Sequence, residues 1–157
     1  MSCPPLLRKL FYLLLPLVGG GLVGFLTRSG MESYETLQRP PLSPPGIVFP
    51  IAWTILYLLM GWASWRIVCR FGKRAPGMDW YWLQLGLNFL WPVLFFSLEL
   101  RGAALVLRVI LLGAAGRCAW LFSRQDRLAG WLLVPYLAWL GFAAYLNLGV
   151  VWLNGIS

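Results

Sequence analysis

Long apolar runs, broken only by short polar segments, most constrain how this chain can fold. Charged residues make up 11% of its 157 residues, against about 25% in a typical soluble domain. In hydrocarbon, backbone N–H and C=O groups must be paired within the protein, which favours α-helices. We therefore predict an all-α integral membrane protein, a five-helix transmembrane bundle that forms a single domain over residues 1–157. Five runs can each cross about 30 Å of hydrocarbon: 10–26, 47–68, 80–98, 103–122 and 128–153.

The segment between the first two spans, residues 28–46, is the longest loop that we predict. It ends in a proline cluster that cannot continue a helix: Pro40, Pro41, Pro44 and Pro45. Loops of this length without regular structure are often functional lids. Prolines also reduce the entropy cost of holding a loop in one shape. We expect a lid-like loop here.

The distribution of charge predicts an orientation. The net charge is +8, but the basic residues lie in turns beside apolar runs and form no basic face, so we expect no nucleic-acid partner. The N-terminus and the second and fourth loops hold eight Lys and Arg, whereas the first and third loops and the C-terminus hold three. The positive-inside rule then places the N-terminus in the cytoplasm. No small-x-small cleavage site follows the first run, so we interpret it as a span and not as a signal peptide.

The chain contains no histidine, which excludes imidazole metal ligands, a histidine general base and a haem with a proximal histidine. Its three cysteines show no repeated spacing that marks a zinc site or a disulfide framework. We also find no acid/base pair, nucleophile arrangement or nucleotide motif. We therefore expect no metal site, no conventional catalytic residues and no required cofactor.

Aromatic and amide side chains recur at helical spacing in three spans, so each set lies on one helix face. The sets are Phe49, Trp53 and Tyr57; Gln84, Asn88, Trp91 and Phe95; and Pro135, Trp139, Ala143 and Leu146 or Asn147. The amides of the third span either bond to other spans, with Asn147 as a candidate partner, or point into a pocket. Aromatic stripes are usually core. A pocket bounded by indoles and a few amides, however, suits a large, flat, apolar ligand such as a macrocyclic aromatic or a sterol.

Two arginines, Arg108 and Arg117, lie inside the fourth span, where a charge costs about 2.5–3.5 kcal/mol on insertion scales. Nine residues of helix turn through about 900°, so the two side chains point to opposite sides. Two interpretations stay open. Either each arginine extends toward the nearer headgroups, or at least one of them pairs with another group or with a ligand.

Several motifs, in order over nearly the whole chain, resemble the TspO/MBR family of tryptophan-rich sensory and translocator proteins. They are Leu37-Gln38-Arg39-Pro40-Pro41 with Pro44-Pro45 and Val48-Phe49-Pro50, Trp53 to Gly61, Gln84-x-x-Leu87-Asn88-x-x-Trp91, and Pro135 to Trp139 with Leu146-Asn147. The resemblance implies a five-helix bundle, often dimeric, in a bacterial membrane or the mitochondrial outer membrane. It also implies a pocket under the first loop for porphyrins such as protoporphyrin IX or haem, for sterols, or for isoquinoline-type ligands.

The resemblance also assigns a ligand site position by position. It implies pocket roles for Trp53, Trp139, Asn88, Tyr34, Pro44, Ala143 and Leu146, and the helical stripes add Phe49, Tyr57, Gln84 and Trp91. Two positions depart from the family: Leu42 stands where many relatives carry an aromatic residue, and Arg108 where relatives tend to carry an acidic group.

Three functions remain under consideration from the sequence. The first is a membrane receptor or carrier for porphyrins, acting in tetrapyrrole transport or stress regulation. The second is a protein that degrades porphyrin with light and oxygen, or one that binds sterols or isoquinolines. The third is a membrane packing protein whose aromatic stripes are only core.

Overall fold

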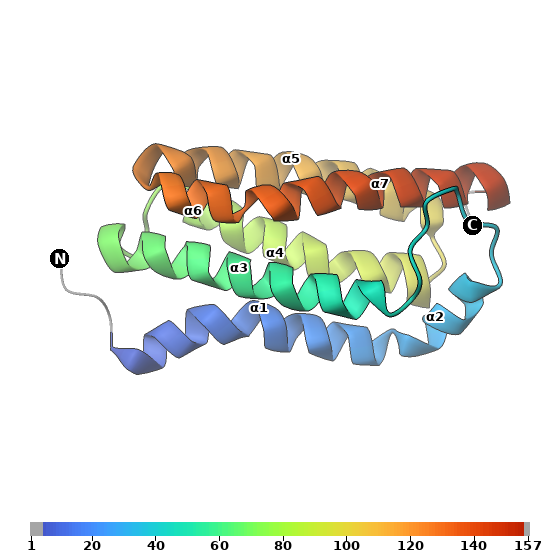
Figure 1. Ribbon diagram of the computed structural model, residues 1–157, viewed down its shortest axis with the longest axis horizontal. Helices are drawn as coiled ribbons and strands as arrows, with labels where there is room; N and C mark the ends of the chain where they lie inside the picture. Colours follow the sequence, from blue (N-terminus) through green and yellow to red (C-terminus); the bar gives the residue numbers. More distant parts are fainter. Residues whose placement is uncertain (1–4, 156–157) are drawn as a thin grey trace.

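The computed structural model describes residues 5–155, and the outermost residues of the domain that we predict, 1–4 and 156–157, lie outside this range. No strand occurs in the described range. The elements are α1 (Leu6–Leu26), α2 (Arg28–Glu35), α3 (Val48–Phe71), α4 (Met78–Pro92), the π-helix η1 (Val93–Ser97), α5 (Arg101–Gln125), α6 (Arg127–Leu132) and α7 (Val134–Asn154). Figure 1 shows the long helices side by side along one axis, with α2 and the loop that follows it at one end.

Four helical runs are long and apolar enough to cross a membrane: α1, α3, α5 and the pair α6 and α7 over Arg127–Asn154. Leu133 separates that pair, because Pro135 has no N–H with which to continue the helical hydrogen bonds. The third span that we predict, 80–98, takes another form. Its α-helix α4 has only 15 residues, about 22 Å of rise, and continues directly into η1. The predicted count of five helices is therefore wrong, because α2, α6 and η1 are separate elements.

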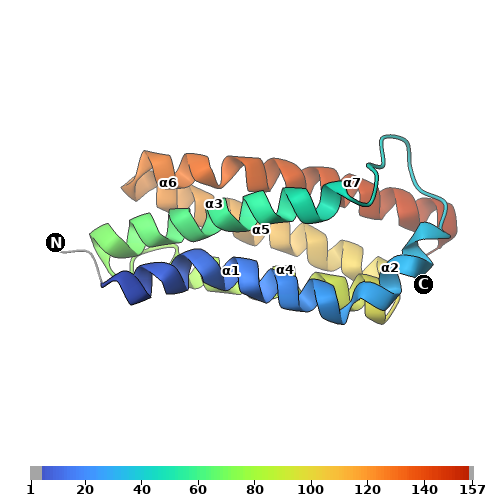
Figure 2. The same cartoon turned by 60° about the horizontal axis from the view of Figure 1, so that its bottom comes forward.

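The predicted loop over residues 28–46 is wrong in its first part, which forms the helix α2. Arg28–Glu35 contains no proline, and the prolines begin only at Pro40. Thr27 marks the break between α1 and α2, with φ −102° and ψ 7°, and its Oγ1 donates to the Val23 carbonyl at 2.9 Å. Figure 2 shows the rest of the segment passing beside the end of α7 before it enters α3.

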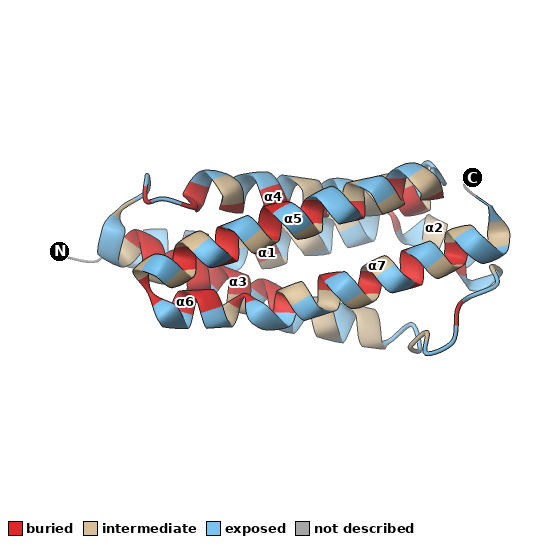
Figure 3. Ribbon diagram, turned by 90° about the horizontal axis from the view of Figure 1, so that it is seen from above, coloured by how far each residue is buried: buried red, intermediate tan, exposed pale blue. Residues whose placement is uncertain are grey.

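The helices pack most tightly at the end away from α2. There a large apolar cluster joins α1, α3, α4, α5, α6 and the first part of α7, with Met60, Leu111 and Phe122 fully buried in it. α3 packs against α6 but makes few contacts with α7, so the bundle is looser at the α2 end. Figure 3 shows buried residues along the inner faces of the helices and exposed ones on the outside. The packing thus leaves room between α3, α4 and α7 near α2.

At the tightly packed end, Asp126 joins α3 to the start of α6. Its Oδ2 accepts a hydrogen bond from Arg66 Nε at 2.8 Å and lies 3.3 Å from Arg70 Nη1. Its Oδ1 accepts from the Leu128 N–H at 3.1 Å and caps α6. Burial by itself would raise the pKa of Asp126, but the hydrogen bond and charge of Arg66, followed by Arg70 and the Leu128 N–H, lower this pKa below its usual value.

Replacing Asp126 by asparagine is expected to lower the free energy of unfolding by about 1 kcal/mol at neutral pH. The change removes the charge-assisted bonds but keeps a side chain that caps a helix well, whereas Asp126→Ala also loses the cap, at a further cost of about 1 kcal/mol. Because the pKa is lower in the folded than in the unfolded state, where it is about 3.9, the stabilisation is present above that value. It disappears as the pH falls through the folded-state pKa.

Thermal unfolding of the wild type and both variants, at neutral pH and at strongly acidic pH, measures this difference. The control is Glu32→Gln, because Glu32 is exposed and makes no ion pair within the described residues. If the unfolding temperature of the wild type exceeds that of Asp126→Asn by the same amount at both pH values, the expectation is contradicted.

Candidate functional site

A cavity of about 440 Å³ lies in the looser half of the bundle, beneath α2. Ligand pockets for small molecules typically measure about 300–1,000 Å³. Residues from α1, α2, α3, α4, η1, α5 and α7 line the cavity. Every long helix therefore contributes to its wall, and the position of the cavity follows from the way α3 and α7 separate.

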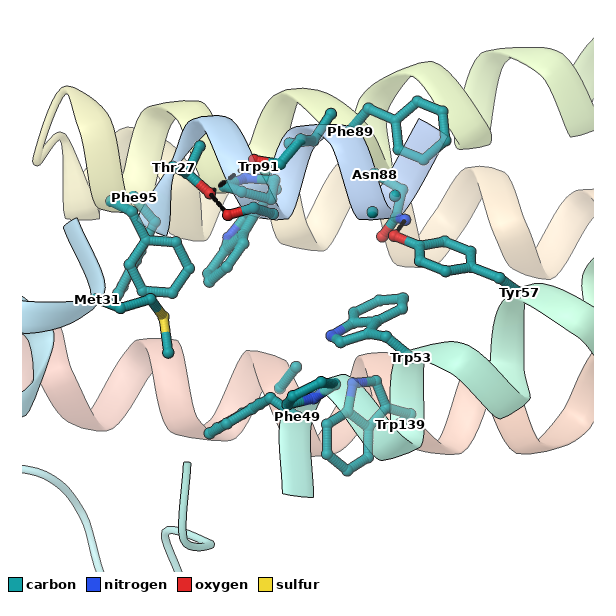
Figure 4. Close-up of a pocket in the computed structure, with 18 of the residues that line it drawn as sticks. Thr27, Met31, Phe49, Trp53, Tyr57, Asn88, Phe89, Trp91, Phe95 and Trp139 are labelled. Carbon is teal, nitrogen blue, oxygen red and sulfur yellow. Dashed lines mark hydrogen bonds between the residues drawn. The ribbon is translucent and has the colours of Figure 1, made fainter. Parts of the chain in front are cut away.

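Two groups of aromatic side chains face each other across this cavity (Figure 4). The first group comes from α3 and α7: the Trp53 ring lies 5.2 Å from Tyr57 and 6.3 Å from Trp139, and Phe49 lies 6.0 Å from Trp139, all between ring centroids. We call these four residues the lower wall.

The second group comes from α4 and η1. The rings of Trp91 and Phe95 are stacked 4.7 Å apart, and Phe89 and Phe96 also line the cavity. We call these four residues the upper wall. Phe95 and Phe96 belong to the π-helix, a rare form that is frequently found at functional sites. The two walls leave a slot whose faces are aromatic rings.

Hydrogen bonds between helices fix one polar side chain of each wall, Tyr57 in the lower wall and Trp91 in the upper wall. Asn88 Nδ2 donates to the Tyr57 hydroxyl at 2.8 Å, which joins α4 to α3. Trp91 Nε1 donates to Asn147 Oδ1 at 3.0 Å, and Asn147 Nδ2 donates to the Arg101 carbonyl at 3.3 Å. These bonds hold the rings in place before any ligand enters, which lowers the entropy cost of binding.

The end of α1 and the helix α2 cover the cavity. Met31 and Tyr34 of α2 line it, and the Tyr34 ring lies 5.8 Å from Phe95 and 6.5 Å from Phe49, so it contacts both walls. Burial raises the pKa of Tyr34, and the nearby Arg39 partly offsets that rise. We call α2 the lid helix.

The proline-rich part of the loop lies against α7 and outside the cavity. The Tyr145 hydroxyl donates to the Pro41 carbonyl at 2.7 Å. Asn154 Oδ1 accepts from the Gln38 N–H at 3.1 Å, and its Nδ2 donates to the Gln38 carbonyl at 2.7 Å. Leu42 is 82% exposed and does not line the cavity.

Nine of the eleven site residues that the sequence predicts line this one cavity: Tyr34, Phe49, Trp53, Tyr57, Asn88, Trp91, Trp139, Ala143 and Leu146. Pro44 is half-buried in the loop and lies outside it. Gln84 also lies outside the cavity; its Oε1 accepts from the Tyr136 hydroxyl at 2.6 Å. Each amide of the third span thus bonds to another helix, but neither of them pairs with Asn147.

Sequence reasoning missed part of the lining. Gly20, Gly24, Thr27 and Met31 follow one another at intervals of three and four residues and all line the cavity. Their spacing was a usable signal, because small residues on one helix face leave space beside it. Arg108 also lines the cavity.

The two arginines of α5 differ completely in their surroundings. Arg117 is exposed, and its guanidinium lies 4.9 Å from the Trp120 ring. Arg108 is only 2% exposed, so it does not extend to the headgroups. Its guanidinium carbon lies 3.9 Å from the centroid of the Trp91 ring. The interpretation that each arginine extends toward the nearer headgroups is therefore wrong for Arg108.

Comparisons with known proteins agree with the motifs in the sequence. The profile of the TspO/MBR family matches residues 12–153. The translocator protein of Bos taurus is 39% identical over 149 residues, which covers 92% of this chain and 88% of the bovine protein. The tryptophan-rich sensory protein of Cereibacter sphaeroides is 37% identical over 123 residues, covering 78% and 77% of the two chains. The human translocator protein is 36% identical over 150 residues, covering 92% and 88%.

Proposed function

The chain belongs to the TspO/MBR family, and on this premise we propose that it is a membrane protein that binds porphyrins or related flat, apolar molecules between its two aromatic walls. The slot between the lower and upper walls carries this proposal. Aromatic rings stabilise flat ligands by stacking or edge contacts, at about 0.5–1.5 kcal/mol per pair beyond the area that they bury. Apolar side chains make up most of the lining, and four of its polar residues bond to each other, Asn88 to Tyr57 and Trp91 to Asn147.

The arrangement of charge supports a membrane orientation as part of this proposal. The start of α1, the end of α3 with the loop to α4, and the α5–α6 junction lie at the same end of the bundle (Figure 1). These three regions hold most of the basic residues. We propose that this end faces the cytoplasm and that the lid helix lies on the opposite side of the bilayer. A homodimer, which the resemblance implies, stays a prediction.

Replacing Trp53 and Trp139 together by leucine is expected to weaken protoporphyrin IX binding about 30-fold or more. Each ring forms a face of the slot, and loss of a central aromatic anchor typically costs about 2 kcal/mol. The measurement is a titration of the purified protein followed by the shift of the absorption band of the porphyrin itself, because tryptophan fluorescence changes with the substitution.

The matched control is Trp131→Leu with Trp152→Leu. These two tryptophans are 65% and 85% exposed and do not line the cavity, so this variant should bind as the wild type does. Far-ultraviolet circular dichroism and thermal unfolding show whether both variants stay folded. Unchanged porphyrin affinity in a folded Trp53→Leu, Trp139→Leu protein would rule out this site.

A further inference from the structure

Arg108 is a buried cation without a counter-charge among the described residues. It is 2% exposed, and neither its Nε nor its Nη1 forms a hydrogen bond within the described residues. Buried charges are normally paired, because an isolated ion loses its hydration without compensation. A charge in this state needs a counter-charge from outside the chain.

None of the five carboxylates of the chain supplies that counter-charge. Asp126 pairs with Arg66 and Arg70 at the opposite end. The other four, Glu32, Glu35, Asp79 and Glu99, are exposed, and within residues 5–155 none forms an ion pair with Arg108. The Tyr57 hydroxyl, which accepts a hydrogen bond from Asn88, is neutral and supplies no counter-charge either.

The geometry of Arg108 is fixed and open to the cavity. The guanidinium lies over the Trp91 ring at 3.9 Å, a cation–π contact, and the bond to Asn147 holds that ring in place. A guanidinium whose flat face is covered still presents donors along its edge, and the fork of these donors matches the two oxygens of a carboxylate. Arg108 also lines the slot itself.

We propose that Arg108 binds the carboxylate of a flat aromatic ligand in the slot, so that this protein selects acidic ligands over their neutral counterparts. This proposal rests on the proposed function, because it places the ligand in the same slot between the two walls. It adds the chemical class of the ligand: an apolar aromatic body between the walls and one anionic group that reaches α5. A charge-assisted pair of this kind, in a site shielded from water, forms only when the ligand is ionised.

Two acid and ester pairs test this inference: protoporphyrin IX with its dimethyl ester, and pyrenebutyric acid with its methyl ester. The affinities of all four are measured for the wild type and for Arg108→Leu in the same detergent. The ratio of acid to ester affinity is then compared between the two proteins, which cancels the different partitioning of acid and ester into detergent. We expect this ratio to fall about 10- to 100-fold in the variant, with ester affinity changed only a few-fold.

Arg117→Leu is the matched control, because it removes an exposed arginine from the same helix and should leave the ratio unchanged. Arg108→Gln serves as a second variant with a polar side chain, and its ratio should fall as well. If both Arg108 variants keep the wild-type ratio for both pairs, the proposal is overturned.

The pyrene pair separates this proposal from porphyrin binding. If neither porphyrin binds but the ratio for the pyrene pair falls in the variants, the porphyrin function fails and the role of Arg108 stands. If both porphyrins bind and the ratio does not change, the role of Arg108 fails and the porphyrin function stands. If none of the four probes binds the folded wild type, both are overturned.

Discussion

Replacing Gly61 by valine is expected to lower the free energy of unfolding by about 3 kcal/mol, the upper part of the usual range for overpacking. A Cβ atom at Gly61 of α3 would stand 2.7 Å from the Leu13 carbonyl oxygen and 2.8 Å from the Leu13 Cα. Both atoms belong to the backbone of α1, so a side-chain rotation cannot relieve the clash and the two helices must separate.

α1 is especially sensitive to such a separation, because it is the least buried of the four candidate spans. Only 11% of its most apolar 18-residue stretch is buried, against 33–39% of the corresponding stretches in the other three. Its contact with α3 is its main attachment. Since α1 also lines the cavity, we expect ligand affinity to fall together with stability.

Thermal unfolding in detergent, with Gly86→Val as the matched control, checks this prediction. Gly86 lies within α4, and a Cβ there would meet nothing within 4 Å. The control therefore carries the same change in side chain without the clash. Equal unfolding temperatures for the two variants would show that α1 and α3 do not approach each other at Gly61.

Replacing Gly30 by valine is expected to speed ligand dissociation about 10- to 100-fold, corresponding to about 1.4–2.8 kcal/mol of lost docking energy. Gly30 belongs to the lid helix and lies directly against the Phe96 backbone of η1. A side chain there pushes the lid helix away from the upper wall. We expect little change in global stability, because the large apolar cluster lies at the other end of the bundle.

Dissociation is followed by stopped-flow dilution of the complex with protoporphyrin IX. Cleavage by a glutamate-specific protease gives a second reading that needs no ligand, because Glu32 and Glu35 lie on the lid helix and should be cut faster when it is displaced. Ser29→Val is the control, because it places valine at an exposed neighbouring position. Wild-type dissociation and cleavage rates in Gly30→Val would show that the lid helix does not depend on this contact.

Much of the architecture was predictable, because it depends on patterns that act over many residues. Each apolar run that we predict as a span contains a helix or a pair of successive helices. The i, i+4 spacing of Phe49, Trp53 and Tyr57 placed all three rings on the side of α3 that faces the cavity. Helix periodicity is sufficient for such predictions, since it does not require knowledge of the partner helix.

Features that depend on the partner helix could not be predicted. Pro92 signals a distorted helix at this point, but it does not specify the π-helix over Val93–Ser97, whose Phe95 and Phe96 rings contact Tyr34 of α2. The direction of Arg108 likewise follows from the position of Trp91 on α4. The lid helix differs from the predicted loop because the prolines that prevent a helix begin only at Pro40, and Arg28–Glu35 contains none.

The π-helix also affects how chains of this kind should be aligned. Its hydrogen bonds span one residue more than those of an α-helix, as in the bond from the Leu98 N–H to the Val93 carbonyl at 2.9 Å. In an evolutionary comparison η1 therefore counts as a single-residue insertion. A homologue with one residue fewer within η1 would close this wider turn into a regular α-helix, which changes where Phe95 and Phe96 stand in the cavity wall. A one-residue gap at this point would thus mark a change in the shape of the cavity, and not a neutral difference in loop length.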